Sequence, residues 1–372
     1  MTSCDVLIVG GGPAGSTCAW KLVREGMNVI VVDKARFPRD KVCAGWITPQ
    51  VVQSLQLDVA SYSRSRTFEP FSGFHVGLFD QPGVEVAYDH PVSFGIRRCE
   101  FDDYLLQRSG APLRLGSAVN EIQRSTTGWT INGELECRML VGAGGHFCPV
   151  ARRLRKADSA RRSLVTAVEV EFPVGAGPEC GPARHPRLYF RDDLSGYGWC
   201  VRKGEYLNVG IGLVDSRETT SELSRLEEIL AADRAWPREP RPRFHGHAYY
   251  LYDGARSEVV DDGVLLIGDA AGLAYPQSGE GIRPAIESGL MAAETILEAR
   301  GNYARARLNG YRAKLVRRLG NAKASLASRT FQSLGQGLQH SLVRRFMRWP
   351  RFVSRYVMGR GFLHSDQAAF LS

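Results

Sequence analysis

The sequence predicts an α/β fold with three parts: a doubly wound domain built on a parallel sheet, a mainly antiparallel β-sheet inserted into it, and a C-terminal helical tail. Three observations lead to this prediction. A strand, a glycine-rich turn, a helix and a second strand follow one another within the first 33 residues, and a second strand–turn–helix unit starts at residue 263. Several strand-like runs lie between the two units. The length of 372 residues agrees with more than one domain of roughly 150 residues.

The first unit has the pattern of a dinucleotide-binding turn. A short apolar strand over residues 4–9 leads into the glycine-rich turn, a helix over residues 14–24 follows with Gly26 at its C-cap, and a strand over residues 28–32 ends in Asp33. We expect Gly10 to allow the tight turn, Gly12 to let the backbone approach a pyrophosphate, and Gly15 to let helix and strand pack closely. Asp33 is placed to accept hydrogen bonds from a ribose. Together these features predict a dinucleotide site, which a bare GxGxxG would not do.

The second unit repeats this arrangement near residue 270. A buried strand over residues 263–267 is followed by Gly268 and Asp269, then by Pro276 and the run Gly279-Glu280-Gly281-Ile282, and a long amphipathic helix reaches Ala299. A helix N-terminus that follows a strand in this way is a second place where negative charge can be held.

The segment between the two units predicts the inserted sheet. Two alternating strands within residues 73–88, separated by Gln81-Pro82-Gly83, predict a hairpin, and a helix over Arg98–Arg108 and a strand over residues 138–142 return the chain to the first domain. The antiparallel strands are expected at residues 164–171, 187–191, 197–202, 206–213 and 244–250, with a helix over residues 219–233 on their outer face. The predicted division is residues 1–72, 95–160 and 255–300 for the first domain, 73–94 and 161–254 for the inserted domain, and 301–372 for the tail.

Composition places the chain among globular proteins. Hydrophobic residues make up 44% and charged residues 23%, which excludes disordered and fibrous classes. The eight cysteines form no CxxC pair and no zinc-like spacing, so we expect no metal site, and the N-terminus lacks the pattern of a signal peptide. We therefore expect a reducing, cytoplasmic location. The cysteines are Cys4, Cys18, Cys43, Cys99, Cys137, Cys148, Cys180 and Cys200.

The positive charge is concentrated in the tail. Residues 301–372 contain 14 Lys and Arg and one acid, so their net charge is +13. Because the net charge of the whole chain is +9, the first 300 residues carry −4. The acidic body argues against nucleic acid, so contact with an anionic membrane surface or a protein partner belongs to the tail alone. The longest uncharged stretch near the start, residues 6–20, is shorter than the roughly 20 apolar residues that a spanning helix needs.

Apolar residues recur through the tail among arginines, in the pattern of a basic amphipathic helix. They are Leu338, Leu342, Val343, Phe346, Met347, Phe352, Val353, Tyr356 and Val357. Such a helix either lies on an anionic membrane as a peripheral contact or packs its apolar face onto the body, and both interpretations stay open.

Beyond the pattern itself, the motifs resemble a known superfamily. The N-terminal turn, Arg98 with Phe101-Asp102, and Gly268-Asp269 with the run at 276–282 resemble the glutathione-reductase-type FAD fold of flavin monooxygenases, halogenases and geranylgeranyl reductases, the p-hydroxybenzoate hydroxylase-like superfamily. Within this superfamily, three segments most resemble the geranylgeranyl reductase branch. They are FPRDKVCAG at residues 37–45, GYGW at residues 196–199 with Lys203-Gly204, and the run at residues 276–282. The resemblance covers most of residues 1–300. It implies a Rossmann domain that binds FAD, an inserted substrate domain, and no separate nicotinamide domain.

The resemblance also implies which residues contact the cofactor. It places Asp269 on a ribityl hydroxyl and the backbone of Gly281 and Ile282 beside the negative charge of a reduced flavin. Ala143-Gly144-Gly145 stands where the superfamily usually has Ala-Asp-Gly, which leaves open whether NADPH or a redox protein is the electron donor. The full implied set is Gly10, Gly12, Ala14, Gly15, Asp33, Ala44, Arg98, Val119, Gly268, Asp269, Pro276, Gly279, Gly281 and Ile282.

The candidate catalytic residues are few, because FAD itself carries the chemistry. The resemblance places Cys43 beside the flavin ring, where its thiol either donates a proton, controls access or is a small core residue. Trp46, Tyr197 and Trp199 are candidates for the wall of a flat or lipidic substrate site. Glu280 is either an acid or base near the flavin or a helix-capping residue. Lys203 is either a contact for an anionic substrate group or a solvated rim residue.

Three functions remain open at this point. The first is a geranylgeranyl reductase-like flavoprotein acting on an apolar or isoprenoid substrate. The second is a flavin monooxygenase that hydroxylates an aromatic small molecule or a peptidyl side chain, because the same fold serves both chemistries. The third is a flavin-bound protein whose role is partner binding through the tail. A halogenase is disfavoured, since Ala44-Gly45-Trp46 stands where halogenases carry Gly-Glu-Ser.

Overall fold

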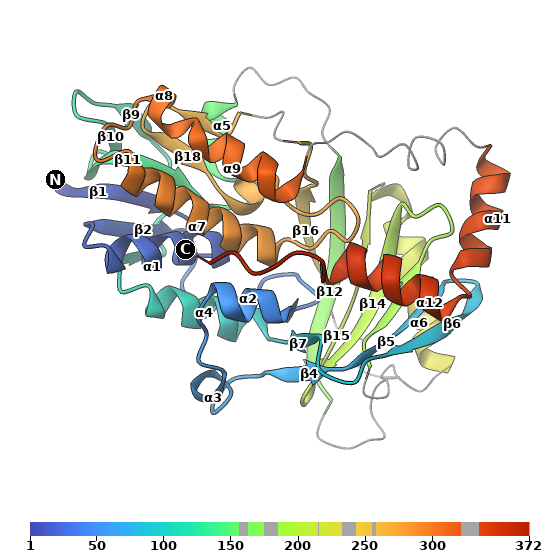
Figure 1. Cartoon of the computed structure of the whole chain (residues 1–372). Helices are drawn as coiled ribbons and strands as arrows, with labels where there is room; N and C mark the ends of the chain where they lie inside the picture. The colour runs from blue at the N-terminus through green and yellow to red at the C-terminus, as the bar shows by residue number, and fades with distance from the viewer. Residues whose placement is uncertain are drawn as a thin grey trace.

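Two β-sheets lie side by side in the computed structural model, with helices around them and the C-terminal helices running along the second sheet (Figure 1). The model describes residues 1–155, 163–174, 185–214, 216–232, 243–254, 258–320 and 335–371. Cys180 and the last residue of the helix expected over residues 219–233 lie outside these ranges. The predicted fold class is confirmed, whereas the domain boundaries drawn from the sequence stay a prediction.

The first sheet is built around the N-terminal strand. β1 (Thr2–Val9) pairs in parallel with β2 (Val29–Asp33) on one side and with β11 (Leu135–Gly142) on the other. Val6, Leu7 and Ile8 of β1 are fully buried, as expected for a strand covered on both faces. The strand order is β17-β18-β11-β1-β2-β8, with β10 paired to β11 and β9 to β10. These outer strands are β8 (Leu113–Leu115), β9 (Ile122–Arg124), β10 (Trp129–Ile131), β17 (Val260–Asp261) and β18 (Val264–Leu266).

Three helices pack together beside this sheet (Figure 1). They are α1 (Pro13–Arg24), α4 (Arg98–Arg108) and α7 (Ile282–Glu298), and all three were expected from the sequence. α7 approaches α1 so closely that a Cβ atom on Gly289 would come within 2.5 Å of the carbonyl oxygen of Ala14. The short helices α2 (Pro49–Ser54), α3 (Val59–Tyr62) and α5 (Pro149–Leu154) and the 3-10 turn η2 (Gly268–Ala270) complete this part.

The second sheet has seven strands in the order β16-β12-β15-β14-β13-β5-β6. All neighbours are antiparallel except β5 and β13, which confirms the mainly antiparallel inserted sheet. The 3-10 turn η1 (Ser216–Glu218) leads into α6 (Thr219–Ala232), which packs Leu226 and Leu230 against Val209 and Ile211. The strands are β5 (Gly73–Leu78), β6 (Gln81–Ala87), β12 (Leu164–Pro173), β13 (Arg187–Phe190), β14 (Gly196–Lys203), β15 (Tyr206–Leu213) and β16 (His245–Tyr250).

The predicted hairpin forms, but its turn is not at Gln81-Pro82-Gly83. β6 already begins at Gln81, so Phe79 and Asp80 connect the two strands. β6 is the last strand of its sheet, and at such an edge the missing N–H of Pro82 removes no ladder hydrogen bond. The turn-forming residues therefore lie inside the strand. A small third sheet of β3 (Trp46–Ile47), β7 (Ser93–Gly95) and β4 (Glu69–Phe71) was not predicted, because strands this short carry no readable alternation.

The tail packs on both parts of the body. α9 (Gly310–Leu319) follows α8 (Arg305–Leu308) and lies on the first domain, where the hydroxyl of Tyr311 donates to the carbonyl of Leu266 at 2.9 Å. α11 (Gln336–Phe346), α12 (Pro350–Phe352) and the π-helical segment η3 (Val353–Phe362) run along the second sheet (Figure 1). Across the described ranges, no helix combines the length and apolar character needed to cross a bilayer.

The apolar stripe of the tail is partly buried and partly exposed. Val343, Met347 and Val353 are buried in the core of the second sheet, whereas Leu338 and Tyr356 are exposed. The packing interpretation therefore holds for one side of the stripe, and the other side faces outward.

Candidate cofactor and substrate site

A cavity of about 590 Å³ lies where the first sheet, the second sheet and the tail meet. It brings together all but two of the predicted cofactor residues and all four candidate catalytic residues: Gly10, Gly12, Ala14, Asp33, Ala44, Arg98, Val119, Gly268, Asp269, Gly279, Gly281 and Ile282, with Cys43, Trp46, Tyr197 and Trp199. Gly15 and Pro276 do not line it. Gly15 is buried between α1 and β1, where a Cβ atom would collide with the carbonyl of Gly10, and Pro276 is exposed.

The glycine-rich turn forms one end of the cavity. Gly10 has φ +118°, and a Cβ atom there would overlap the backbone of Ala143, so only glycine fits. Gly12 is the N-cap of α1 and has no side-chain cap, and a Cβ atom on it would meet only the Arg39 guanidinium at 3.4 Å. The free amides of the helix N-terminus therefore face the cavity, where they can hold an anionic group. Asp33 fixes this turn by accepting hydrogen bonds from the Gly11 and Ala35 amides, both at 2.8 Å.

Arginines supply positive charge beside the turn. Nε and Nη2 of Arg98 donate to the two carboxylate oxygens of Asp102, each at 2.8 Å, and Nη2 of Arg39 lies 3.2 Å from the same carboxylate. Arg98 also hydrogen-bonds the side chain of Cys43. This arrangement holds Arg98 rigidly between α4 and the Cys43 segment, because a bidentate pair fixes both the position and the plane of the guanidinium.

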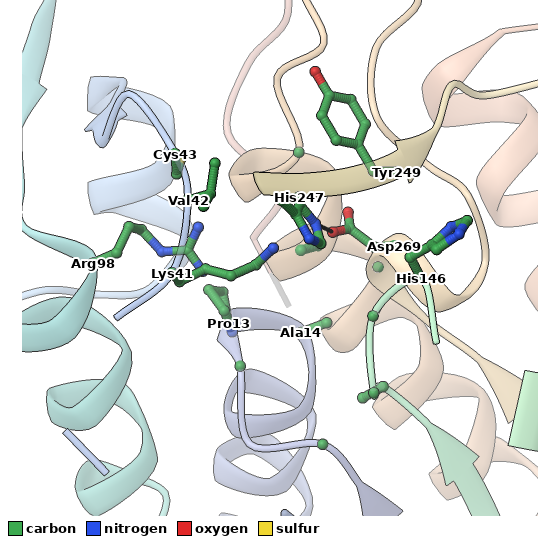
Figure 2. Close-up of a pocket in the computed structure, with 18 of the residues that line it drawn as sticks. Pro13, Ala14, Lys41, Val42, Cys43, Arg98, His146, His247, Tyr249 and Asp269 are labelled. Carbon is green, nitrogen blue, oxygen red and sulfur yellow. Dashed lines mark ion pairs between the residues drawn. The ribbon is translucent and has the colours of Figure 1, made fainter. Parts of the chain in front are cut away.

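Lys41, His247 and Asp269 form a charged cluster that sequence reasoning missed. Figure 2 shows Lys41 extending across the cavity toward His247 and Asp269, and Nε2 of His247 lies 3.6 Å from Oδ2 of Asp269. Burial lowers the pKa of Lys41 to about 8, although the negative charge of Asp269 acts in the opposite direction and raises it. Burial alone would raise the pKa of Asp269, but the neighbouring His247 ring and the charge of Lys41 bring it below the usual value. The alternation of His245 and His247 was visible in the sequence, whereas their acidic partner was not.

Aromatic rings form the wall on the side of the second sheet. Tyr197 and Trp199 project from β14 with centroids 6.0 Å apart, and Trp46 comes from β3. Phe362 of the tail completes the wall, 6.0 Å from Trp46 and 5.2 Å from Tyr197. Two of the rings have their polar atoms bonded to other protein groups: the Tyr197 hydroxyl donates to the carbonyl of Ser278 at 2.6 Å, and Nε1 of Trp199 donates to Oδ1 of Asn208 at 2.7 Å. The wall therefore presents apolar surface.

A buried polar network in the second sheet holds the backbone beside Cys43. Nδ2 of Asn208 donates to the carbonyl of Cys43 at 3.3 Å, Nζ of Lys203 donates to the carbonyl of Ala44 at 3.2 Å, and Glu169 accepts from the Cys43 amide. Lys203 is fully buried and lies 2.5 Å from Glu171. Both expectations for Lys203 are therefore wrong, because it neither lines the cavity nor lies at a solvated rim.

Glu280 lines the cavity at the start of α7. Its Oε1 accepts from the Arg283 amide at 3.0 Å, so the carboxylate caps the helix as the capping interpretation requires. Its Oε2 is buried and has no hydrogen-bond partner in the part of the chain that the structure describes. Burial raises the pKa of Glu280 to about 7. The described residues contain no cluster of three or more His, Cys, Asp or Glu side chains that could hold a metal ion.

Comparison with known proteins identifies the family. Residues 5–98 match the family model described as FAD-dependent oxidoreductase (DAO). A protein named menaquinone reductase from Mycobacterium tuberculosis is 32% identical over 322 residues, which span 79% of this chain and 76% of that protein. The chain belongs to the geranylgeranyl reductase-like family of FAD-dependent oxidoreductases. Another relative, named geranylgeranyl diphosphate reductase, from Rhodobacter capsulatus, is 28% identical over 79% of this chain and 75% of that protein.

Solved structures share the fold of this family member over nearly its whole length. A geranylgeranyl bacteriochlorophyll reductase-like protein from Thermoplasma acidophilum has a TM-score of 0.78 at 20% identity and covers 98% of both chains. PqsL of P. aeruginosa in complex with 2-aminobenzoylacetate has a TM-score of 0.70 at 22% identity, over 96% of this chain and all of that chain. Reductases and oxygenases thus share this architecture, so the fold alone does not choose the reaction.

The cofactor of this geranylgeranyl reductase-like enzyme is FAD, and the residues present fit it. The amides at the start of α1 with Arg39 and Arg98 suit a pyrophosphate, and Asp33 lies at the end of β2 where a ribose would be held. Asp269 and the N-terminus of α7 also line the cavity, where they suit polar groups of the ribityl chain and flavin. When bound, FAD supplies hydride transfer. The individual contacts remain predictions.

Proposed function

We propose that this oxidoreductase reduces a carbon–carbon double bond in the prenyl chain of an isoprenoid lipid. The observation that carries the proposal is the aromatic wall of Trp46, Tyr197, Trp199 and Phe362, in which the Tyr197 hydroxyl and Nε1 of Trp199 are already bonded to other protein groups. A prenyl chain offers no hydrogen bonds, so it loses nothing against such a wall and gains from leaving water. Relatives support the same class, since they are named for menaquinone, geranylgeranyl diphosphate and digeranylgeranylglycerophospholipids.

Within this proposal the four candidate catalytic residues have separate roles. The rings of Trp46, Tyr197 and Trp199 hold the prenyl chain and exclude water. Cys43 controls the approach to the flavin ring. Its backbone is held by the second sheet on one side, and its thiol lies beside Arg98 on the other. All four act by positioning, which leaves the source of the proton to another group.

The test separates reduction from oxygenation. Bound flavin is reduced anaerobically and mixed with a prenyl quinone or a geranylgeranyl lipid. We expect flavin reoxidation together with a product that has gained one H2. If the reduced enzyme ignores every prenyl lipid but forms a hydroperoxide band with oxygen and hydroxylates an aromatic compound or a peptidyl side chain, it is a monooxygenase and the proposal is wrong.

The same reduced-flavin assay identifies the electron donor. NADPH and a reduced redox protein such as a ferredoxin are offered separately to the oxidised holoenzyme, and the rate of flavin bleaching is measured. The loop of Ala143, Gly144 and Gly145 borders the cavity without the acid that is usual in the superfamily, so we expect bleaching by the redox protein to be the faster reaction. Faster bleaching by NADPH would contradict this expectation.

We further propose that the outer face of the tail docks on an anionic membrane. Trp349 is 51% exposed and Tyr356 is 44% exposed, and arginines flank both rings: Arg345 lies 6.0 Å from the Trp349 centroid, and Arg355 and Arg360 lie 5.8 and 5.3 Å from Tyr356. Exposed aromatic rings between cations suit the headgroup layer of an anionic bilayer, where each charge contributes about 1 kcal/mol. The apolar residues that pack on the body are on the opposite side.

Vesicle sedimentation tests the docking face. Intact holoenzyme is expected to bind vesicles of anionic phospholipid at low salt and to release them at high salt, because the charges are screened. Trp349→Ser with Arg345→Glu should abolish binding while FAD stays bound. Leu194→Ser removes a residue of similar exposure (50%) from the connection between β13 and β14 and should leave binding unchanged. Absence of binding by the intact protein would refute the docking face.

A further inference from the structure

We propose that Glu280 is the acid that supplies the proton when the double bond is reduced, releasing it from Oε2 into the cavity. This inference rests on the proposed function and deepens it, because it assigns the second of the two hydrogens that the substrate gains. It is argued from the position of one carboxyl group and from what surrounds it.

The turn before α7 fixes Glu280 at the cavity. The Gly279 amide donates to the carbonyl of Tyr275 at 2.8 Å, and the Tyr275 amide donates to the carbonyl of Glu280 at 2.9 Å, so the turn is closed from both ends. Gly279 has φ +67°, which favours glycine, and the Glu280 amide donates to Oγ of Ser278 at 3.3 Å. The backbone of Glu280 is thus held by two hydrogen bonds, and its side chain cannot leave the cavity without breaking the cap on Arg283.

The two carboxyl oxygens have different tasks. Oε1 is used by the helix cap, and Oε2 is buried in the cavity wall without a hydrogen-bond partner in the described ranges. A buried, unpaired oxygen is costly when it carries charge and much less so when it carries a proton. The geometry therefore favours a carboxylic acid, rather than a carboxylate, in the wall of the cavity.

The groups that face Glu280 do not neutralise it. From α7 these are Arg283 and Glu287, and Nε of Arg283 is already committed to Glu287 at 2.9 Å. Tyr197 of β14 and Tyr275 of the preceding turn also face Glu280, and the Tyr197 hydroxyl is occupied by Ser278. Burial raises the pKa of Glu280 to about 7, the range in which a general acid is most effective near neutral pH.

The step balances with one hydride and one proton. One alkene carbon receives the hydride, with its electron pair, from the reduced cofactor, and the other receives the proton from Oε2. The carbon–carbon double bond becomes a single bond and the cofactor returns to its oxidised form. Glu280 is left as a carboxylate and takes a proton from water, and NADPH or a reduced redox protein restores the reduced cofactor.

The decisive variant is Glu280→Gln, which retains an oxygen to cap Arg283 but has no acidic proton. Holoenzyme is reduced with dithionite and mixed with a prenyl lipid, and the rate of flavin reoxidation is followed from pH 5.5 to 8.5. We expect E280Q to be slowed by about 100-fold or more with unchanged lipid affinity. The wild-type rate should fall as pH rises through about 7, and that fall should be absent in the variant. Glu294→Gln, on the outer side of the same helix and paired with Lys314, is the matched control and should keep the wild-type rate.

A substrate-free measurement keeps this inference separate from the proposed function. The absorbance of bound, oxidised FAD is titrated, and we expect a shift with a midpoint near pH 7 in the wild type and in E294Q but not in E280Q. If the wild type reduces no prenyl lipid, the proposed function fails, and the titration alone then decides whether Glu280 ionises beside the cofactor. A wild-type rate in E280Q, or a midpoint that persists in it, would overturn the assignment and leave Glu280 as a helix cap.

Discussion

Replacing Lys203 with Met removes the one ammonium in the buried network below Cys43. Lys203 is fully buried, lies 2.5 Å from Glu171 and donates to the carbonyl of Ala44. Met retains most of the aliphatic stem, so the packing is largely kept and the loss is electrostatic. Breaking a buried ion pair from one side costs about 3–5 kcal/mol, because the remaining charge is stranded. Arg97 still neutralises Glu171 at 2.9 Å, which places the expected loss near 3 kcal/mol.

The loss should depend on pH through Glu169. Burial raises the pKa of Glu169 to about 7 in the folded protein, and Lys203 opposes this rise. Because the folded pKa exceeds the unfolded one, this carboxyl stabilises the fold less as pH increases toward 7. Without Lys203 the folded pKa rises further and the carboxylate has no compensating charge. The stability deficit of K203M relative to the wild type should therefore be larger at pH 8 than at pH 6.

Urea denaturation at pH 6 and pH 8, followed by circular dichroism, measures this deficit. Lys21→Met is the matched control: Lys21 pairs with Glu25 across one helical turn at 3.2 Å on the surface, and such a pair contributes only about 0.3–0.5 kcal/mol. If K203M is as stable as K21M, or if its deficit does not grow with pH, the buried network does not hold the Cys43 segment in the way described here.

Three further predictions concern the cavity. Gly12→Val should give folded but colourless protein, because the valine side chain enters the space for the pyrophosphate. Gly10→Ala should lower the thermal stability of the fold itself, because the added Cβ overlaps the backbone of Ala143. Absorbance at the flavin bands and melting curves distinguish the two variants. Cys43→Ala should keep the flavin spectrum and lower turnover, and full activity would make Cys43 a packing residue. Phe362→Ala should leave FAD bound and weaken prenyl-lipid binding about tenfold or more, as expected for the loss of one buried aromatic contact; an unchanged Kd would show that Phe362 does not contact the lipid.

Local patterns were enough to predict the cofactor side of the molecule. The elements β1, α1 and β2, and later β18 and α7, are each specified by short runs of apolar residues and by glycines at turns, and α4 spans the predicted residues Arg98–Arg108. The role of Gly15 could also be assigned, because it faces the backbone of Gly10, whereas the overlap of Gly10 with Ala143 is a contact between distant residues. Such features depend on residues close in sequence, which is why one sequence reveals them.

The rest of the site depends on contacts between distant residues. Lys203 reaches the carbonyl of Ala44 across 159 positions, and no property of either residue predicts that pairing. Phe362 lies beyond the apolar stripe read from the tail, which ends at Val357, and nothing in the sequence indicates that its ring lines the cavity. Lys41 appeared in the sequence as one residue of a motif, whereas its cluster requires a strand and a turn more than 200 residues away.

The contacts of residues 367–370 tie the substrate side of the cavity to the first domain. Arg283 of α7 donates to the carbonyls of Gln367 and Ala368 at 2.9 and 3.1 Å, and the Phe370 amide donates to Oγ of Ser54. The residues that suit FAD all precede α8, whereas Phe362, the last ring of the substrate wall, is among the final residues of the chain. The cofactor side and the substrate side of the cavity are therefore supplied by different parts of the sequence. The substrate wall is complete only when η3 packs against the second sheet and the residues that follow it bind α7 and α2.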